Sequence, residues 1–393
     1  MTIEQEITKY LEDAGALKVG FTNQEILKDG PPSTVLSTYL PEAKSAIVFA
    51  IPMDREIARS YLAKDNINAR SDHEKDNYRT LIKSFKLGLD VKDILVSKGF
   101  KAKAVFPNFE YKSYDVKGLF KPFPIISLRY LAAMSGVGSL GWSGNLGIKD
   151  FGPAITLGGI VTSAELEPTP PLPESESFCV MCKICTQVCA FRMFSVKEEE
   201  IVTIGDRKLT YSKRLDKLRC ENICGGYNGL DKKGKWSTWA SGRAKYPETD
   251  EESINSFAES FRFDPGVLVD GEDGGIDPKE FVEDPRMAEY FKENQIVLSQ
   301  VSNIKLTCGN CQLVCRGNDL NGTKENLKLL KESGMVIRKE NGRTQILKGE
   351  EIVNVEKLHH PTEPNDRERS ACEIIKKAFT EDKKYNFSFF PSP

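Results

Sequence analysis

Residues 179–189 read Cys179-Val-Met-Cys182-Lys-Ile-Cys185-Thr-Gln-Val-Cys189, and the interpretation of the whole chain starts from this stretch. The spacing C-x2-C-x2-C-x3-C is typical of bacterial ferredoxins, in which the cysteine thiolates hold a [4Fe–4S] cluster. The first three sulfurs bind one cluster, whereas the fourth normally binds a second cluster. The run therefore predicts another group of cysteines elsewhere in the chain.

A second group is present downstream. The stretch Cys308-Gly-Asn-Cys311-Gln-Leu-Val-Cys315 supplies C-x2-C-x3-C, and a further sulfur is available upstream of it at Cys220 or Cys224. Two C-x2-C pairs alone could instead hold zinc. A zinc site uses four ligands, however, and leaves the third and fourth sulfurs of the first run without a role. The two groups therefore predict two [4Fe–4S] clusters that share crossed ligands and lie close enough to exchange electrons.

The composition favours metal binding over disulfide bonds. The 393 residues include ten cysteines, nine of them between positions 179 and 315, and Cys372 is expected to be an ordinary half-buried thiol. Disulfide frameworks belong to small secreted domains, and the N-terminus has neither a basic region nor a twin-arginine pair, so we expect a cytoplasmic protein. The net charge of −2 gives no reason to expect nucleic acid as a partner. No apolar run reaches the length of a membrane span.

Apolar periodicity predicts an α/β or α+β domain in the first half of the chain. The continuous apolar run at 45–51, bounded by Pro41 and Pro52, predicts a strand that is buried on both faces. The other elements expected before the first cysteine run are helices over 2–14, 74–97 and 126–134 and strands over 17–21, 101–106 and 155–162. After Cys315 we expect an amphipathic helix around 327–330 and a hairpin that turns at Asn341-Gly342.

A glycine-rich segment follows the predicted helix over 126–134. It reads Gly136-Val-Gly138-Ser-Leu-Gly141-Trp142-Ser143-Gly144-Asn145 and contains a literal G-x-G-x-x-G. A dinucleotide fingerprint needs a preceding strand and a helix that opens within the motif, whereas here a helix precedes it, and further glycines and Pro153 follow. We therefore expect a tight bend or close backbone approach to a large flat group, and no Rossmann site.

These features together resemble the cobalamin-dependent reductases that comprise epoxyqueuosine reductases and reductive dehalogenases. The resemblance extends over roughly residues 1–320, and its most specific parts are the glycine segment and Cys308–Cys315. It implies a nitroreductase-like α/β domain that binds a base-off corrinoid, followed by a ferredoxin-like 2[4Fe–4S] domain. The clusters would deliver electrons to cobalt, and the reductive chemistry would belong to the cofactor.

The resemblance also implies boundaries and ligands. We expect a cofactor-binding domain over 1–167, a two-cluster domain over 168–325 with a charged insertion at 231–300, and a C-terminal packing segment over 326–393. Gly136, Gly138, Gly141, Trp142, Ser143, Gly144 and Asn145 would contact the cobalamin. Cys179, Cys182, Cys185 and Cys315 would hold one cluster; Cys189, Cys308, Cys311 and an upstream cysteine would hold the other. Similar proteins place that ligand after an arginine, which favours Cys220, preceded by Arg219, over Cys224.

Three departures from the family are present, and two of them bear on the substrate. Ala190 and Arg316 stand where a proline usually follows the cysteines, and Lys121-Pro-Phe-Pro124 stands where epoxyqueuosine reductases carry a proton-donating aspartate. No helical-repeat tail that would hold tRNA is recognised, so a tRNA substrate is not expected. Reductive dehalogenases use a tyrosine with a nearby lysine or arginine, and the candidates here are Tyr111, Tyr114, Tyr130, Lys149 and Arg129.

The expected function is that of an oxidoreductase that passes electrons through two [4Fe–4S] clusters to a bound base-off cobalamin and reduces a small organic substrate. Its electron donor would be a low-potential protein such as ferredoxin or flavodoxin. One alternative is a two-cluster protein that reduces a partner's corrinoid or flavin and has no substrate of its own. Another is a scaffold whose first domain has lost its cofactor. The chain has three histidines and no corrinoid lower-ligand motif, which suits a base-off cofactor and leaves too few histidines for a His-based triad.

Overall fold

The computed structural model describes residues 1–107, 111–112, 123–214, 220, 223, 228–243, 284–293, 308–338 and 344–353. Tyr114, Cys224 and Cys372, three residues considered above, lie outside these ranges, as does most of the predicted charged insertion. Within the described ranges, no helix combines the length and the apolar character that a membrane crossing requires.

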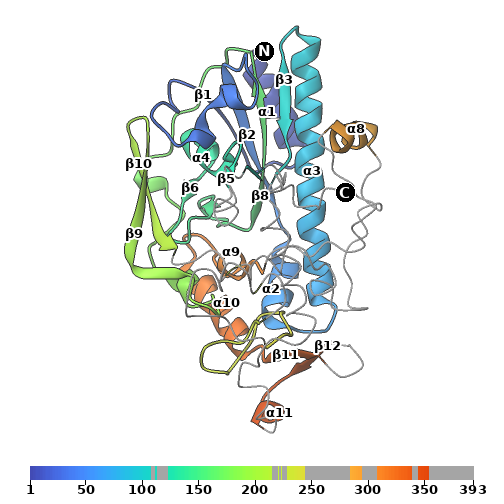
Figure 1. Cartoon of the computed structure of the whole chain (residues 1–393), viewed down its shortest axis with the longest axis vertical. Helices are drawn as coiled ribbons and strands as arrows, with labels where there is room; N and C mark the ends of the chain where they lie inside the picture. Colours follow the sequence, from blue (N-terminus) through green and yellow to red (C-terminus); the bar gives the residue numbers. More distant parts are fainter. Residues whose placement is uncertain are drawn as a thin grey trace, which may run out of the picture.

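The upper half of the molecule is built on a four-stranded sheet (Figure 1). Its strands are β1 (Lys18–Asn23), β2 (Ser45–Pro52), β8 (Ile155–Thr162) and β3 (Ala102–Val105), in the order β1-β2-β8-β3. All neighbouring pairs are antiparallel, and Ile47 on β2 lies opposite Ile160 on β8. The antiparallel pairing of strands far apart in sequence brings the segment after β8, which leads to the first cysteine run, beside the start of the chain.

Both faces of this sheet are covered by helices. On one face α1 (Ile3–Asp13) and the 29-residue α3 (Ala69–Ser97) pack against Ile47, Phe49 and Ile51 of β2. On the other face α4 (Leu128–Met134) packs against Ala46, Val48 and Ala50. Because adjacent strand residues point to opposite faces, β2 serves two cores, and the prediction of a doubly buried strand is confirmed.

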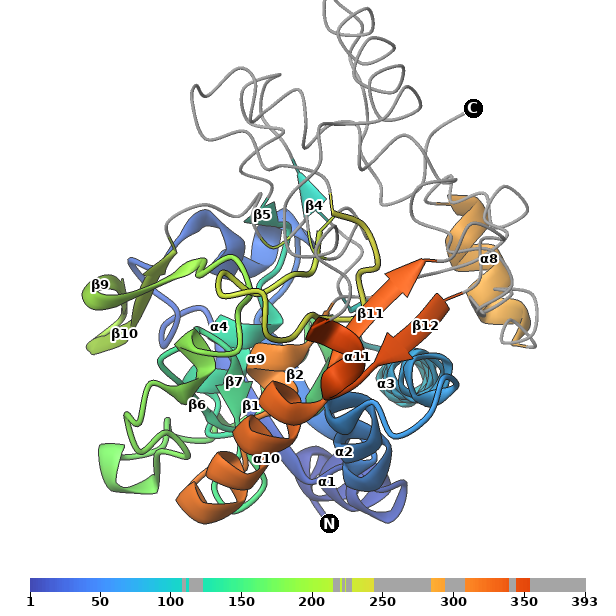
Figure 2. The ribbon, with the colours of Figure 1, turned by 90° about the horizontal axis from the view of Figure 1, so that it is seen from below.

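The lower half contains a group of helices and the β11–β12 hairpin (Figures 1 and 2). It comprises α2 (Arg55–Ala63), α9 (Asn310–Leu313), α10 (Leu320–Glu332), α11 (Glu350–Val353) and the hairpin of β11 (Met335–Arg338) and β12 (Thr344–Leu347). Its apolar core joins Tyr61, Ile184, Leu313 and Val336. Residues from both sides of position 167 thus share one core, while the boundaries drawn from the sequence remain a prediction.

Short hairpins complete the described chain. The pairs are β4 (Tyr111–Lys112) with β5 (Phe123–Pro124), β6 (Ser139–Leu140) with β7 (Leu146–Gly147), and β9 (Phe194–Ile204) with β10 (Arg207–Arg214). Single turns of 3-10 helix span Pro32–Thr34, Leu36–Thr38, Glu174–Glu176 and Ile184–Thr186 (η5). The sequence predicted neither α2, although its buried Ala58, Tyr61 and Leu62 have helical spacing, nor the β9–β10 hairpin, whose strand β9 is mainly exposed and so lacks an apolar alternation.

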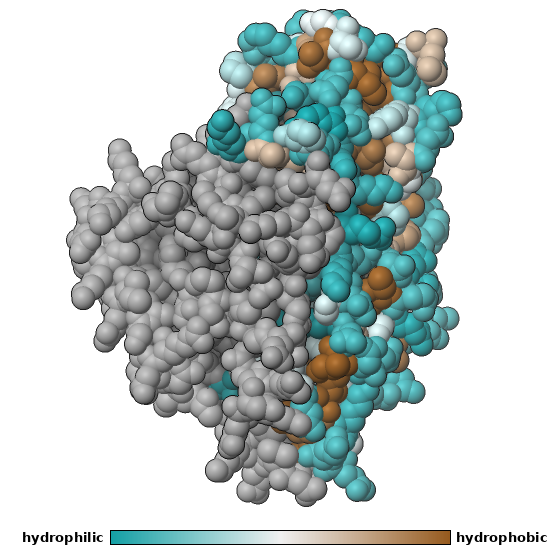
Figure 3. Space-filling view, turned by 90° about the vertical axis from the view of Figure 1, so that its right-hand side faces the viewer, coloured by the Kyte–Doolittle hydropathy of each residue, from teal (hydrophilic) through white to brown (hydrophobic). Residues whose placement is uncertain are grey.

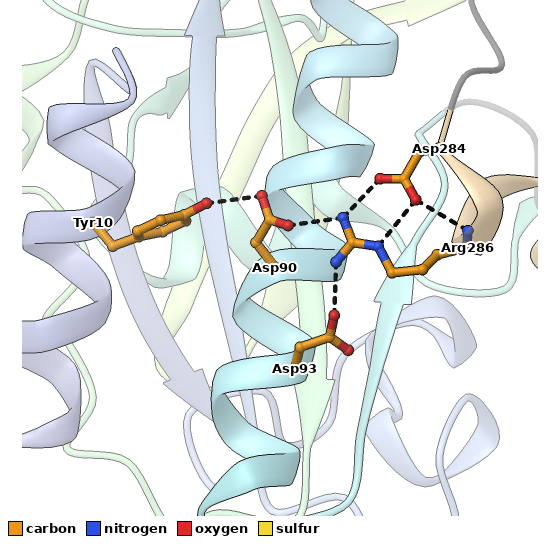
Figure 4. A network of polar contacts seen from close by, with 5 residues as sticks. All are labelled: Tyr10, Asp90, Asp93, Asp284 and Arg286. Carbon is orange, nitrogen blue, oxygen red and sulfur yellow. Dashed lines mark hydrogen bonds and ion pairs between the residues drawn. The ribbon is translucent and has the colours of Figure 1, made fainter.

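Helix α8 (Pro285–Glu293) is attached to the side of α3 by the ion pairs of Arg286 (Figure 4) and by the ring of Tyr290, which lies 4.7 Å from that of Phe85. The Arg286 guanidinium donates to Asp90 at 2.8 Å, Asp93 at 2.6 Å and Asp284 at 2.7 Å, and the hydroxyl of Tyr10 on α1 donates to Asp90 at 2.8 Å. Burial and Asp90 raise the pKa of Tyr10 to about 12. The network joins α1, α3 and α8. In the coloured part of the view in Figure 3 most residues are hydrophilic, and the hydrophobic ones lie in separate groups.

Candidate iron–sulfur site

The two cysteine groups predicted from the sequence meet in the lower half of the molecule. The first run forms the loop that contains η5, and the second forms α9 and its flanking turns, which pack against η5. Helix α2 supports this junction, because the Tyr61 hydroxyl donates a 2.8 Å hydrogen bond to the Cys308 carbonyl. All eight described cysteines are free thiols.

The thiols fall into two overlapping groups. Burial raises the pKa of Cys185, and the sulfurs of Cys311, Cys179, Cys315 and Cys182 add to this effect. Burial likewise raises the pKa of Cys308, and its sulfur neighbours are Cys220, Cys311 and Cys189. The sulfurs of Cys179, Cys182, Cys185 and Cys315 therefore lie together, as do those of Cys189, Cys220, Cys308 and Cys311, and Cys311 borders both groups.

The loops that carry these thiols turn sharply. Met181 and Lys183 have φ angles of 55° and 58°, and Gly309 has a φ of 67°. Left-handed residues between right-handed ones aim successive backbone N–H groups into one concavity, a conformation found at many Fe–S sites. Only Gly309 adopts this region at no steric cost, so the strain at Met181 and Lys183 is held by the surrounding structure.

Several N–H groups already donate to sulfur. The backbone N–H of Trp142 lies 3.4 Å from Cys179 Sγ, that of Met193 lies 3.3 Å from Cys189 Sγ, and Asn145 Nδ2 lies 3.6 Å from Cys311 Sγ. Such bonds stabilise the thiolate over the thiol, and bonds of this kind also help to set the reduction potential of a bound cluster.

Other buried donors in the same region have no acceptor. Trp142 Nε1, Arg214 Nε and Asn310 Nδ2 are buried and form no hydrogen bond in the described chain. Trp142 borders a cavity that is also lined by Cys179, Cys182, Cys185, Cys311 and Cys315. An unmet buried donor costs about 1–3 kcal/mol. A sulfur-rich group in this cavity would supply acceptors to such donors.

The donor set fits two polynuclear clusters. Four closely packed thiols cannot all ionise without a cation among them, because each thiolate disfavours its neighbours. Among the described residues, no three His, Cys, Asp or Glu side chains lie together as the ligands of one metal ion do. Cysteine thiolates are also the ligands of [4Fe–4S] clusters.

The glycine segment borders this site. Residues 139–147 form the β6–β7 hairpin, which is the tight bend considered above, with a turn over 141–145. Trp142 and Asn145 contact cysteine sulfurs, and the Ser143 and Gly144 carbonyls accept hydrogen bonds from Arg214 and Arg129. Gly136, Gly138 and Gly141 pack closely against Pro170, Gly147 and Phe178, respectively. Their predicted contact with a cobalamin remains a prediction.

Two of the predicted catalytic residues belong to a polar chain beside this segment. The Tyr130 hydroxyl lies 3.2 Å from that of Tyr211, which donates to the exposed carboxylate of Glu200 at 3.2 Å. Burial and the contact with Tyr130 raise the pKa of Tyr211. Arg129 Nη1 donates to the Gly144 carbonyl at 2.5 Å, and its guanidinium lies 5.8 Å from the centre of the Tyr130 ring.

Of the other candidates, Lys149 has its ion-pair partner outside this chain of contacts. Lys149 forms a 3.1 Å ion pair with Glu176, Tyr111 lies in β4, and Tyr114 lies outside the described residues. Sequence reasoning missed Tyr211 and Arg214 altogether. Both lie on the unpredicted strand β10. Tyr211 is 81 residues from Tyr130 and Arg214 is 71 residues from Ser143, so no local signal indicated their proximity.

Comparison with known proteins returns matches among solved structures only. No family model matches the chain, and no curated protein matches its sequence. An epoxyqueuosine reductase solved with an epoxyqueuosine-modified tRNA-Tyr stem loop aligns with a TM-score of 0.39 and 15% identity, covering 97% of this chain and 95% of that one. The epoxyqueuosine reductase from Bacillus subtilis aligns with a TM-score of 0.37 and 16% identity, covering 98% and 96%.

A reductive dehalogenase, whose structure suggests a mechanism for B12-dependent dehalogenation, aligns with a TM-score of 0.41 and 14% identity. The alignment covers 86% of this chain and 38% of the dehalogenase. These matches come from the two groups of proteins that the sequence motifs resemble.

Proposed function

We propose that this chain is an iron–sulfur oxidoreductase that passes electrons through two [4Fe–4S] clusters to a bound base-off cobalamin and thereby reduces a small organic substrate. The observation that carries the proposal is the sorting of eight thiols into two groups of four. The first group takes three cysteines from the first run and Cys315 from the second. The second group takes Cys308 and Cys311 from the second run, Cys189 from the first run, and Cys220. Crossing of this kind is the ligand pattern of two-cluster ferredoxins.

The two groups suit electron transfer because they share a border at Cys311. A bound pair of clusters would supply one-electron redox chemistry at this place. The protein's own contribution is to hold the sulfurs, to donate N–H groups to them, and to exclude water with apolar residues such as Val188 and Leu313, which are at most 3% exposed. The electron donor would be a low-potential protein such as ferredoxin or flavodoxin.

The cobalamin is inferred from the sequence resemblance. When bound, it would supply a strongly nucleophilic and reducing cobalt. The described residues offer no donor set for it comparable to the cysteines, so no step is assigned to it. Tyr130 would supply a proton to the substrate, and Tyr211 and Glu200 would connect it to solvent through the two 3.2 Å contacts.

A second function is favoured by one observation. Trp142 and Asn145, two residues expected to contact the corrinoid, are engaged with cysteine sulfurs. This arrangement suits a two-cluster protein that reduces the corrinoid or flavin of a partner and has no substrate of its own. Under both functions we expect a cytoplasmic redox protein that receives electrons from a protein donor and has no nucleic acid as a partner. The localisation and the lack of a nucleic-acid partner remain predictions.

The discriminating experiment is anaerobic reconstitution with iron and sulfide, followed by hydroxocobalamin and gel filtration. The first function predicts about eight irons per chain, as expected for two [4Fe–4S] clusters, and co-elution of corrinoid with the protein. Loss of all corrinoid with the iron retained would reject the first function and favour the second. A chain that binds no iron would reject both.

If corrinoid is retained, turnover of small organohalides tests the proton path. Tyr130→Phe should lower kcat by about 10²–10⁴-fold, the usual contribution of a general acid. Lys149→Gln is the matched control, because Lys149 pairs with Glu176, and it should leave kcat within about twofold. Equal losses in the two variants would contradict the assignment of Tyr130.

A further inference from the structure

One lysine is buried beside the second group of cysteines. Lys64 follows the last residue of α2 in a left-handed conformation with a φ of 48°, and it is only 1% exposed. Its ammonium group donates a 2.5 Å hydrogen bond to the Ser333 hydroxyl. Among the described residues no carboxylate forms an ion pair with Lys64. A buried ammonium without a counter-charge is costly, so its position calls for an explanation.

The last turn of α2, just before Lys64, contacts the cysteine site. Tyr61, one turn before Lys64, donates to the carbonyl of Cys308. Burial lowers the pKa of Lys64 to about 7, while the sulfur of Cys308 favours the charged form and Lys348 opposes it. The neighbouring group that favours the ammonium is therefore a cysteine of the second thiol group. A cluster at that position would bring a net negative charge and would act as the missing counter-charge.

We propose that Lys64 provides a buried positive charge that raises the reduction potential of the cluster containing Cys308. The inference rests on the proposed function, since it presupposes the two clusters. Reduction adds one electron from the protein donor to the cluster and makes its net charge more negative by one, with no proton transferred. A fixed cation stabilises the reduced form more than the oxidised form, and weak screening in the protein interior makes the effect large. Net charge is a recognised determinant of cluster potentials.

The test is a redox titration of reconstituted wild-type and Lys64→Met protein, followed by electron paramagnetic resonance. At a fixed potential, the ratio of reduced to oxidised protein should fall at least tenfold for one cluster, which corresponds to about 59 mV for a one-electron couple. The other cluster should keep its ratio, since it is held by the group around Cys185.

Two controls separate charge from packing. Lys348→Met removes a charge from an exposed side chain whose ammonium lies 3.5 Å from the Ala63 carbonyl, and solvent screening should keep its effect below twofold. Ser333→Ala removes the hydrogen bond of Lys64 and retains its charge, so it should also change the ratio little. If Lys64→Met fails to fold or to bind iron, Lys64→Gln serves as the neutral variant, because its amide can still donate to Ser333.

The outcomes are distinct. A wild-type chain that binds no iron overturns the proposed function and this inference together. A wild-type chain with about eight irons whose neutral Lys64 variants shift neither cluster, or shift both equally, overturns the role of Lys64 and leaves the clusters in place. A shift in Ser333→Ala as large as that in Lys64→Met would assign the effect to packing and likewise overturn the inference. A shift confined to one cluster in the neutral Lys64 variants supports it.

Discussion

The crossed arrangement of the thiols predicts how many clusters are lost when two cysteines are substituted together. Cys185 and Cys315 come from different runs but belong to the same group of sulfurs, whereas Cys185 and Cys189 come from one run but belong to different groups. Two double variants therefore separate the crossed arrangement from one in which each run holds its own cluster. They are Cys185→Ala/Cys315→Ala and Cys185→Ala/Cys189→Ala.

The expected magnitudes follow from the grouping. With two ligands gone from one group and the other group intact, Cys185→Ala/Cys315→Ala should retain about four of about eight irons. Cys185→Ala/Cys189→Ala removes one ligand from each group and should leave two labile clusters, with fewer than about four irons after treatment with a chelator. An arrangement with one cluster per run predicts the opposite order of iron contents.

The assay is iron and acid-labile sulfide per chain after anaerobic reconstitution and desalting, with circular dichroism to verify that each variant is folded. Cys220→Ala and Cys224→Ala form a matched pair that tests the eighth ligand. The first should lose the cluster of Cys308, because Cys220 borders that sulfur, and the second should keep about eight irons. More iron in Cys185→Ala/Cys189→Ala than in Cys185→Ala/Cys315→Ala would refute the crossed assignment.

Two further predictions concern the framework around the site. Gly147→Ala would place a Cβ 2.8 Å from the ring of buried Phe178, which should lower the free energy of unfolding by about 1–3 kcal/mol in denaturant titrations. Gly88→Ala has room at 3.4 Å in a helix interior and should raise the free energy of unfolding by about 0.5–1 kcal/mol; equal effects of both changes would contradict this packing. Arg286→Leu should lower the thermal midpoint at neutral pH, because Arg286 holds the pKa of Asp284 below its usual value. A carboxyl whose pKa is lowered by folding stabilises the folded state at a pH above its unfolded pKa of about 3.9, and this stabilisation is lost as the pH falls. The difference in thermal midpoint between Arg286→Leu and wild type should therefore shrink below about pH 4. A difference that does not depend on pH would argue against the ion pairs.

Local sequence predicted much of the framework. The strand over 155–162 and the hairpin around 341–342 were expected from apolar runs and turn residues, and the structure has β8 at Ile155–Thr162 and strands on both sides of that turn. Helix α3 begins at Ala69, five residues before its predicted start, because its first turn is supported by contacts with α2 and the lower core and has little amphipathic pattern of its own.

In the candidate site, too, some features follow from local sequence and others from tertiary packing. Cysteine spacing alone predicts the metal, the cluster type and the crossed ligands, which stay predictions, since thiolate chemistry and short loops restrict what such spacing can bind. The polar chain of Tyr130 and Tyr211 and the buried Lys64 carry no such spacing. Each lies near its partner only because distant elements pack together, so nothing in the neighbouring residues could indicate it.

The amino-acid sequence by itself determined the chemistry available to this protein: two runs of thiols, a bend of glycines and a doubly buried strand, each defined by residues within a few positions of one another. The tertiary structure decided how these parts combine. It places Trp142 of the β6–β7 turn and Arg214 of strand β10 near cysteine sulfurs. It also places the buried ammonium of Lys64, at the end of α2, near Cys308. The physical reason is that spacing fixes which ligands one loop can offer, whereas packing between distant segments sets their charge neighbours and hydrogen-bond donors.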